Sequence, residues 1–373
     1  MLSSSAPQTF TSEEVTFPTY SPDEPSSPAW TLAGTLLLPT EQTSTKRYPA
    51  VLMIAGSGPV NRDGNITSGL VRINLNLYNR LAEHLTSQGG VATLRYDKRG
   101  AGKSLIPGDS NAFDRAGLFD FAHDALGAYA FLTTQPSIDP TKILILGHSE
   151  GSIIIPALAS LLLSSTPTLP NPHGFLFLSG VAEHLPEATA RQRRLIRDEV
   201  NTMSGIKGWL ARKAATEERV EGQAKKAVEE ALNSQEDFKS NFIGLKTPLK
   251  WWREHWHYAG YSSFDSGPAE RTLSPMQIDS AKITAPVFAL TGLKDVQSDP
   301  ALCNVEKVKQ WIPNAKSVEC VVVEDVSHIL RKQDSQASLL ELQKEYVEQG
   351  KRNLDGRVVD RICEWVVQVV LEV

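Results

Sequence analysis

The sequence predicts an α/β fold: a doubly wound, mostly parallel sheet flanked by helices, with a helical lid insertion. Three observations support this prediction. Short apolar runs rich in β-branched residues alternate with segments of helical periodicity. These runs lack polar alternation, as expected of strands that helices cover on both faces. A charged segment of helical spacing interrupts the alternation between residues 183 and 280.

Eight runs are expected to form the strands of this sheet, since most are bounded by glycine or proline. They are EVTFPTY (14–20), WTLAGTLLLP (30–39), YPAVLMIAG (48–56), VATLRYD (91–97), KILILGHS (142–149), GFLFLSG (174–180), APVFALTG (285–292) and SVECVVVED (317–325). Between them, helical spacing predicts helices within 71–90, 119–135 and 152–165, and a last apolar stripe predicts a helix over 359–370.

The change in texture also predicts how the chain divides into domains. Residues 1–182 and 281–373 are expected to form the α/β core, because the strand-like runs lie there. Residues 183–280 are rich in charge, as in RQRRLIRDEV and KKAVEEALNSQEDFK, and their apolar residues follow a helical spacing. We expect this segment to be a helical cap inserted into one core.

Composition excludes several classes of function. The net charge of −5 and the lack of a basic cluster interleaved with aromatics argue against nucleic acid as a partner. No apolar run is long enough to span a membrane, and the N-terminus lacks the pattern of a secretion signal. The three cysteines share no close spacing, so neither a disulfide framework nor a metal site is expected. We expect a soluble, cytoplasmic protein.

The segment Gly147-His148-Ser149-Glu150-Gly151 fits the pattern G-x-S-x-G between a strand and a helix. In that context the pattern predicts a sharp turn that exposes the serine hydroxyl at the end of the sheet. A plain strand-to-helix connection eased by glycines is the alternative. We expect Ser149 to be a nucleophile, with the side chain of His148 pointing away across the turn.

A serine nucleophile requires a base that removes its proton and an acid that orients that base. In sheets of this type the chain order is serine, acid, histidine. His328 is the one histidine beyond the run 285–292, where the acid is expected, and it is therefore the predicted base. Asp295 follows the end of that run and is the predicted acid, with Asp299 and Asp325 as rivals.

Acyl transfer also requires backbone N–H donors for the oxyanion of the tetrahedral intermediate. One predicted donor is the amide of Glu150, directly after the nucleophile. The other is expected in the glycine-rich turn GSGP after the run 48–56, with Ser57 preferred and Gly58 close behind. An ordinary tight turn is the alternative for this loop.

These residues resemble the α/β-hydrolase superfamily over most of the chain outside the helical insertion. RYDKRGAGKS, from Arg95 to Ser104, is similar to the R-x-D-x-R-G-x-G-x-S segment of that superfamily. AGSGPVNRDGN resembles a subgroup of serine esterases and thioesterase-like hydrolases with A-G-S-G-P-x-x-R-D-G-N in the oxyanion loop. The resemblance implies that the insertion covers the active site as a lid.

Two positions depart from the subgroup's pattern. Asn61 stands where the subgroup usually has aspartate, and Ser152 stands where a glycine often follows the serine motif. Both are predicted to lie near the acyl pocket and so to change its preferences. The aromatic segment 251–264 is expected mainly to attach the insertion to the core. Within it, Trp252 and Trp256 are also candidates for an aromatic wall of the substrate pocket.

The predicted function is a serine hydrolase that cleaves a carboxylic ester or thioester through a Ser149 acyl-enzyme, without a cofactor. The substrate is expected to be a small acyl ester or thioester, or one bound to a carrier protein. One alternative is a free-standing, polyketide-type thioesterase/cyclase that releases the acyl chain as a lactone by internal hydroxyl attack. A non-catalytic ligand-binding protein and a peptidase are further alternatives.

Overall fold

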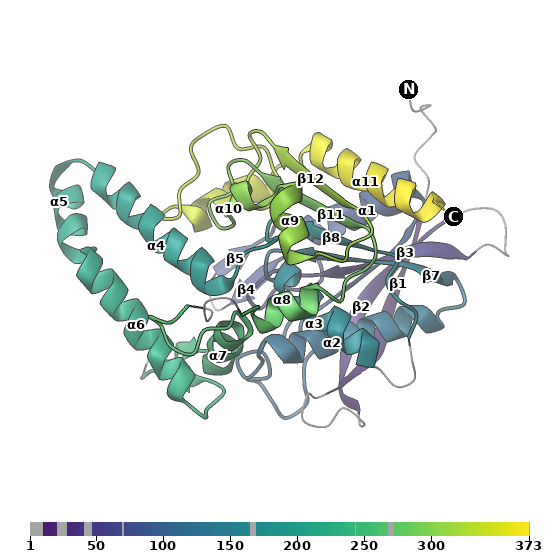
Figure 1. Cartoon of the computed structure of the whole chain (residues 1–373), viewed down its shortest axis with the longest axis horizontal. Coiled ribbons are helices and arrows are strands. Elements are labelled where there is room, and N and C mark those ends of the chain that lie inside the picture. The colour runs from purple at the N-terminus through teal and green to yellow at the C-terminus, as the bar shows by residue number, and fades with distance from the viewer. Residues whose placement is uncertain are drawn as a thin grey trace.

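An eight-stranded sheet forms the centre of the computed structural model, with the strand order β1-β2-β6-β3-β7-β8-β11-β12 (Figure 1). The structure describes residues 10–20, 28–40, 47–68, 71–164, 169–242, 244–267 and 272–372. The strands of the large sheet are β1 (Phe10–Tyr20), β2 (Pro28–Pro39), β3 (Tyr48–Ile54), β6 (Ala92–Tyr96), β7 (Ile138–His148), β8 (Gly174–Leu178), β11 (Val287–Gly292) and β12 (Val318–Val323).

Most of this sheet is parallel, as the sequence predicts. The run from β6 through β3, β7, β8 and β11 to β12 pairs in parallel throughout. β1 and β2 pair antiparallel, and β2 joins β6 antiparallel. The carboxyl ends of the parallel strands therefore meet along one edge, where loops of distant sequence come together.

Helices cover both faces of the sheet (Figure 1). α1 and α11 bury their apolar sides in a core cluster on one face, and α2 and α3 bury theirs in a cluster on the other. The helices are α1 (Leu77–Gly89), α2 (Leu118–Thr134), α3 (Glu150–Ser164), α4 (Leu185–Thr202), α5 (Gly205–Ala214), α6 (Glu217–Asn233), α7 (Leu249–Tyr258), α8 (Pro275–Ser280), α9 (Val305–Trp311), α10 (Leu342–Gly350) and α11 (Gly356–Leu371), with a 3-10 turn η1 (Pro300–Leu302).

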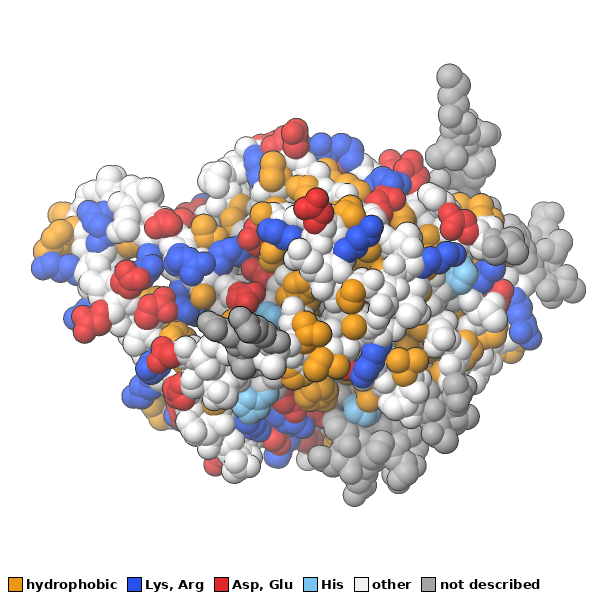
Figure 2. Space-filling model, viewed as in Figure 1, with side chains coloured by type: hydrophobic (Ala, Val, Ile, Leu, Met, Phe, Trp, Pro, Cys, Tyr) orange, Lys and Arg blue, Asp and Glu red, His pale blue; other side chains and the backbone are white. Residues whose placement is uncertain are grey.

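The inserted helices, α4 to α7, lie between β8 and β11 in the chain, within the segment predicted as a cap. They extend to one side of the sheet, with α5 at the far end (Figure 1). Figure 2 shows both signs of charge crowded over this part of the surface. The last helix of the predicted cap, α8, packs against α3 of the core.

One predicted helix starts later than expected. Within 71–90 the helix covers only Leu77–Gly89, because Val71–Ile73 forms β5 and pairs with β4 (Ile66–Ser68). A further small hairpin joins β9 (Lys239–Ser240) to β10 (Lys246–Thr247) in the insertion. Helix α1 ends at Gly89, and the next residue, Gly90, has a φ of 62°, so the paired glycines stop this helix as predicted.

Among the described helices, none is both long and apolar enough to cross a membrane.

Candidate active site

Ser149 lies at the turn from β7 to α3 with a φ of 55°, a strained backbone conformation for a side chain other than glycine. The flanking glycines make this turn possible. A Cβ on Gly147 would lie 2.3 Å from the carbonyl oxygen of Gly151, and a Cβ on Gly151 would lie 2.3 Å from that of Ile54. The motif is therefore a packing requirement, and it places Ser149 at the carboxyl edge of the sheet.

His328 and Asp295 form a buried hydrogen-bonded pair at this same edge. His328 Nδ1 lies 2.8 Å from Asp295 Oδ2, and the backbone amides of Gln297 and Ser298 each donate to Asp295 Oδ1 over 2.8 Å. Burial would raise the pKa of the Asp295 carboxyl, but His328 and these amides lower it below its ordinary value. The carboxylate therefore stays charged and directs the other ring nitrogen, Nε2, away from itself.

The two rival carboxylates have other partners. Asp299 accepts a hydrogen bond from the amide of Ala301 at the start of the η1 turn. Asp325 pairs with Lys294 at 3.0 Å and is half exposed. Of the three candidates for the acid, Asp295 is the one in contact with His328.

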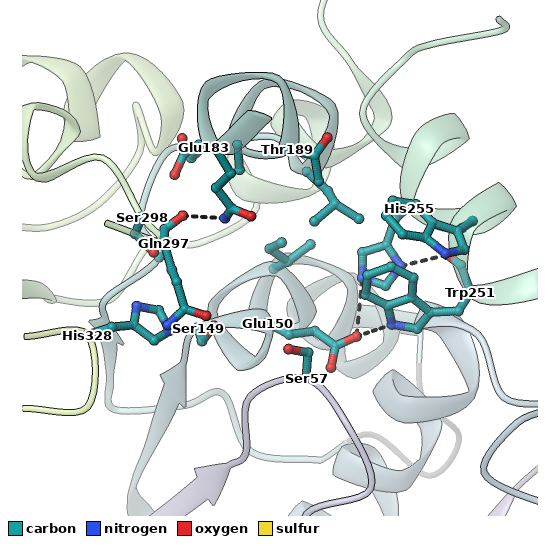
Figure 3. Close-up of a pocket in the computed structure, with 16 residues that line it drawn as sticks. Ser57, Ser149, Glu150, Glu183, Thr189, Trp251, His255, Gln297, Ser298 and His328 are labelled. Carbon is teal, nitrogen blue, oxygen red and sulfur yellow. Dashed lines mark hydrogen bonds and ion pairs between the residues drawn. The ribbon is translucent and has the colours of Figure 1, made fainter. Parts of the chain in front are cut away.

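A cavity of about 230 Å³ joins these groups (Figure 3). Ser149, His328, Glu150 and Ser57 line it from the core, and the inserted helices α4 and α7 complete its wall. The residues that these two helices contribute are Leu185, Ala188, Thr189, Gln192, Trp251, Trp252 and His255. In the part of the chain described, no hydrogen bond joins Ser149 Oγ to His328. In enzymes without substrate this bond is often long, and it tightens when substrate binds.

The loop that carries Ser57 is fixed by the motif residues that follow it. The Arg62 guanidinium pairs with Asp97 at 2.7 Å, and the Arg62 amide donates to the same carboxylate at 2.7 Å. The Asn61 side chain accepts from the amides of Asp63 and Asn65, which closes the turn. Arg62 and Asp97 thus join the two segments that resemble the α/β-hydrolases, and these bonds fix the turn that directly follows Ser57 and Gly58.

Three residues predicted near the pocket lie elsewhere. Asn61 closes the turn just described, and Ser152 is buried with its hydroxyl donating to the carbonyl of Gly147. Trp256 is buried in the insertion, where it packs on Trp252 and Tyr261. None of the three is among the residues that line the cavity. The short polar side chains of Asn61 and Ser152 bond to the local backbone instead. Trp252 does line the cavity.

His148, at the end of β7, links helix α1 to the loop that carries His328. Its ring nitrogens lie 3.1 Å from Tyr78 Oη and 2.9 Å from the carbonyl oxygen of His328, and Tyr78 Oη accepts from the amide of Gly56. Because the His328 carbonyl can only accept, Nε2–H is the donor, and in the neutral ring Nδ1 then accepts the proton of the Tyr78 hydroxyl. Burial, with His328 next, lowers the pKa of His148 to about 3, so the ring stays neutral.

The side chain of Glu150 belongs to a second buried network of hydrogen bonds and ion pairs, which the sequence did not reveal. Its carboxylate pairs with Lys98 at 2.7 Å, accepts from the Trp251 indole nitrogen, and lies 3.4 Å from His255 Nε2 (Figure 3). Burial opposes the charge, but Lys98 and His255 lower the pKa of Glu150 to about 2. This charged network, from here on the Glu150 cluster, ties the turn after Ser149 to α7.

One sequence signal points to part of the Glu150 cluster. Trp251 and His255 are four residues apart, which places both on one face of a helix. Their partner cannot be deduced from spacing, because Lys98 and Glu150 belong to separate motifs. Among the described residues, no group of three or more His, Cys, Asp or Glu side chains is placed to hold a metal ion.

Comparisons with known proteins identify the fold. No family model and no curated protein sequence matches the chain. Solved structures do match. An esterase from the archaeon Pyrobaculum calidifontis is 13% identical, with 97% of this chain and 86% of that chain covered and a TM-score of 0.50. A proline iminopeptidase from Mycobacterium smegmatis is also 13% identical, with 96% and 99% covered and a TM-score of 0.50.

A bacterial heroin esterase also matches, at 13% identity, with 97% of this chain and 84% of that chain covered and a TM-score of 0.50. Sequence identity this low carries no information about substrate, but the coverage spans nearly the whole chain. Together with the mostly parallel sheet and the helices on both of its faces, the similarity shows that the chain has the α/β-hydrolase fold.

Proposed function

We propose that this protein is a serine hydrolase that cleaves a carboxylic ester or thioester through an acyl-enzyme on Ser149. The observation that carries the proposal is the 2.8 Å bond between His328 and Asp295, at the wall of the cavity that Ser149 also lines. A serine on a strained turn, beside a histidine held by a buried carboxylate, is the arrangement that activates a hydroxyl.

In the first step Ser149 Oγ forms a bond to the substrate carbonyl carbon, and its proton passes to His328 Nε2. The amides of Ser57 and Glu150 would donate to the oxyanion, an interaction worth about 3 kcal/mol per donor. As the bond to the leaving group breaks, His328 returns the proton to the departing oxygen or sulfur. Asp295 keeps the imidazole oriented and stabilises its positive charge.

In the second step a water molecule bonds to the acyl carbon and gives a proton to His328. The bond from that carbon to Ser149 Oγ then breaks, His328 returns the proton to Oγ, and the acid is released. Polar side chains in the cavity wall favour hydrolysis over internal attack. Gln297 and Ser298 line it beside His328, and Thr189 and Gln192 line it from α4 (Figure 3). Such a wall can hold an ordered water by hydrogen bonds. For a hydroxyacyl thioester we therefore expect the linear acid, and a lactone as main product would instead support the cyclase.

Turnover of p-nitrophenyl acetate tests the proposal. We expect Ser149→Ala and Asp295→Asn each to lower kcat by about 10⁴-fold, since the members of such a triad act together. Ser152→Ala is the matched control, because Ser152 is three residues away in the same motif and its hydroxyl bonds only to backbone carbonyls. Its kcat should stay within about twofold of wild type.

Two outcomes would overturn the proposal. If Ser149→Ala keeps wild-type turnover, the hydroxyl is not the nucleophile. If the wild-type protein hydrolyses no ester or thioester and forms no adduct with a fluorophosphonate, the protein is a ligand-binding member of this fold.

A further inference from the structure

A second pocket adjoins the cavity at Ser57, Trp251 and Trp252, the residues that line both. Its volume is also about 230 Å³. The remaining lining is Gly58, Phe113, Ala116, Phe121 and Pro248. These residues carry no charge, and the aromatic rings of Phe113 and Phe121 lie 6.0 Å apart. We call this the apolar pocket.

The cavity at Ser149 has a more polar lining, which it combines with apolar side chains such as Ile153 and Leu185. Figure 3 shows Gln297 and Ser298 beside His328, whereas Thr189 lies farther along the wall toward His255. The Gln192 amide nitrogen donates to the backbone carbonyl of Gln297 over 2.8 Å, so α4 is tied to the loop that carries the acid. A group bound here meets hydrogen-bonding partners, and we call this region the polar cavity.

The chemistry at Ser149 fixes which part of a substrate faces each pocket. His328 must reach the leaving-group atom to protonate it, so the leaving group lies on the His328 side. The carbonyl oxygen points to the amides of Ser57 and Glu150. The acyl group is left to extend away from His328. Figure 3 shows His328 and Trp251 on opposite sides of Ser149 and Ser57.

We infer that the protein selects esters or thioesters whose acyl group is a compact apolar or aryl group and whose leaving group is polar. The acyl group fills the apolar pocket and the leaving group occupies the polar cavity. This inference rests on the proposed function and names its substrate class. An apolar cavity of about 150 Å³ holds a benzene molecule, so about 230 Å³ accommodates a benzene ring with a short linker.

Two substitutions of opposite effect test the acyl side. Ala116→Leu narrows the apolar pocket, and Phe113→Ala widens it. With p-nitrophenyl phenylacetate, we expect Ala116→Leu to lower kcat/KM about tenfold or more, since a misfit of one or two methylenes costs that much. The ratio of kcat/KM for p-nitrophenyl phenylacetate to kcat/KM for p-nitrophenyl acetate should therefore fall in this variant, because acetate does not fill the pocket. Phe113→Ala should shift the preference toward bulkier aryl acids, such as naphthylacetate.

Ala188→Leu is the matched control for the leaving-group side, because Ala188 lines only the polar cavity. We expect this variant to change the preference among phenylacetate esters of different alcohols, and to leave the acyl preference unaltered. Wild type should favour alcohols with free hydroxyl or amide groups over alkyl alcohols of the same size. Equal activity on both kinds of alcohol would contradict the polar assignment.

The inference and the proposed function fail in different ways. If acetate turnover depends on Ser149 but Ala116→Leu and Phe113→Ala leave the acyl profile unchanged, the apolar pocket does not bind the acyl group and only the inference is wrong. If Ala188→Leu changes the acyl profile instead, the two assignments are reversed. If acetate turnover survives Ser149→Ala, the proposed function itself is wrong.

Discussion

The two neighbours of Ser149 are both buried, yet they hold the site by different kinds of interaction. On the side of the base, His148 uses neutral hydrogen bonds to Tyr78 and to the backbone of His328. On the side of the insertion, Glu150 uses its charge, paired with Lys98 and bonded to α7. A neutral link keeps extra charge away from His328, whereas a charge pair can join an inserted element to the core.

The two sides should respond to acid at different pH. His148 has its pKa lowered to about 3, mainly by burial, from an ordinary value of 6.5. As pH falls, this histidine therefore binds a proton in the unfolded chain before it does so in the folded protein, and the unfolding free energy falls below pH 6.5. The loss is about 1.4 kcal/mol per pH unit, on the order of 5 kcal/mol by pH 3. Urea unfolding at pH 7, 6, 5 and 4 measures it.

His148→Gln serves as the reference for that series, because its amide can donate to the His328 carbonyl but does not titrate. The gap in unfolding free energy between wild type and this variant should shrink from pH 6.5 downward. A gap that stays constant across this range would show that His148 is already protonated in the folded protein.

Removing the charge of Glu150 should lower the unfolding free energy at neutral pH by nearly as much as acid does through His148. Glu150→Gln leaves the Lys98 ammonium, which is 4% exposed, without its carboxylate. We expect a loss of about 4 kcal/mol, since an unpaired buried charge is strongly destabilising. Replacing both residues, in Glu150→Gln with Lys98→Met, should recover part of this loss. If the double variant is no more stable than Glu150→Gln alone, the unpaired Lys98 charge is not the cause of the lost stability.

The stabilisation by the Glu150 carboxylate should be lost over a lower pH range than the stabilisation that depends on neutral His148. The Glu150 pKa is lowered to about 2 from 4.5, so the stabilisation is complete above pH 4.5 and is lost as pH falls toward 2. The advantage of wild type over Glu150→Gln should therefore stay constant between pH 7 and 5.5. A decline already at pH 6 would place the effect on another group.

Tyr78→Phe sharpens the comparison without adding or removing charge. It leaves the Gly56 amide and His148 Nδ1 without a partner, which should cost about 3 kcal/mol in unfolding free energy. Because both bonds position loops of the active site, kcat for p-nitrophenyl acetate should fall about tenfold or more, with KM little changed. Unchanged kcat would show that the loops keep their places without this link.

The smallest effect is expected for Trp251→Phe. This change removes one hydrogen bond to Glu150, while Lys98 continues to neutralise the carboxylate. We expect a loss of about 1.5 kcal/mol in unfolding free energy. A loss as large as that of Glu150→Gln would mean that the indole, and not the ammonium, holds the carboxylate in place.

Most of the fold could be predicted from the sequence, because strands buried on both faces have continuous apolar sequences. All eight predicted runs overlap strands of the large sheet. The contact between His328 and Asp295 followed from chain order and from the strand end beside Asp295. Both predictions depend on local pattern plus one topological rule.

The residues that the sequence missed depend on contacts between distant segments. Nothing in the spacing of Lys98 and Glu150 indicates that they pair, and nothing around Tyr78 indicates its bond to His148. Asn61 and Ser152 were assigned to the pocket by comparison with a motif, but their side chains bond to the backbone of their own turns. The direction of a short polar side chain at a tight turn is set by the backbone groups within its reach, and a motif match does not reveal these.

The most direct test of the account is the mass of the intact protein after a rapid acid quench in the presence of p-nitrophenyl phenylacetate. We predict one phenylacetyl adduct on wild type and on Ser152→Ala, located by peptide mapping at Ser149, and none on Ser149→Ala. An adduct of equal amount on Ser149→Ala, or one mapped to a different residue, would contradict the central claim that Ser149 is the nucleophile.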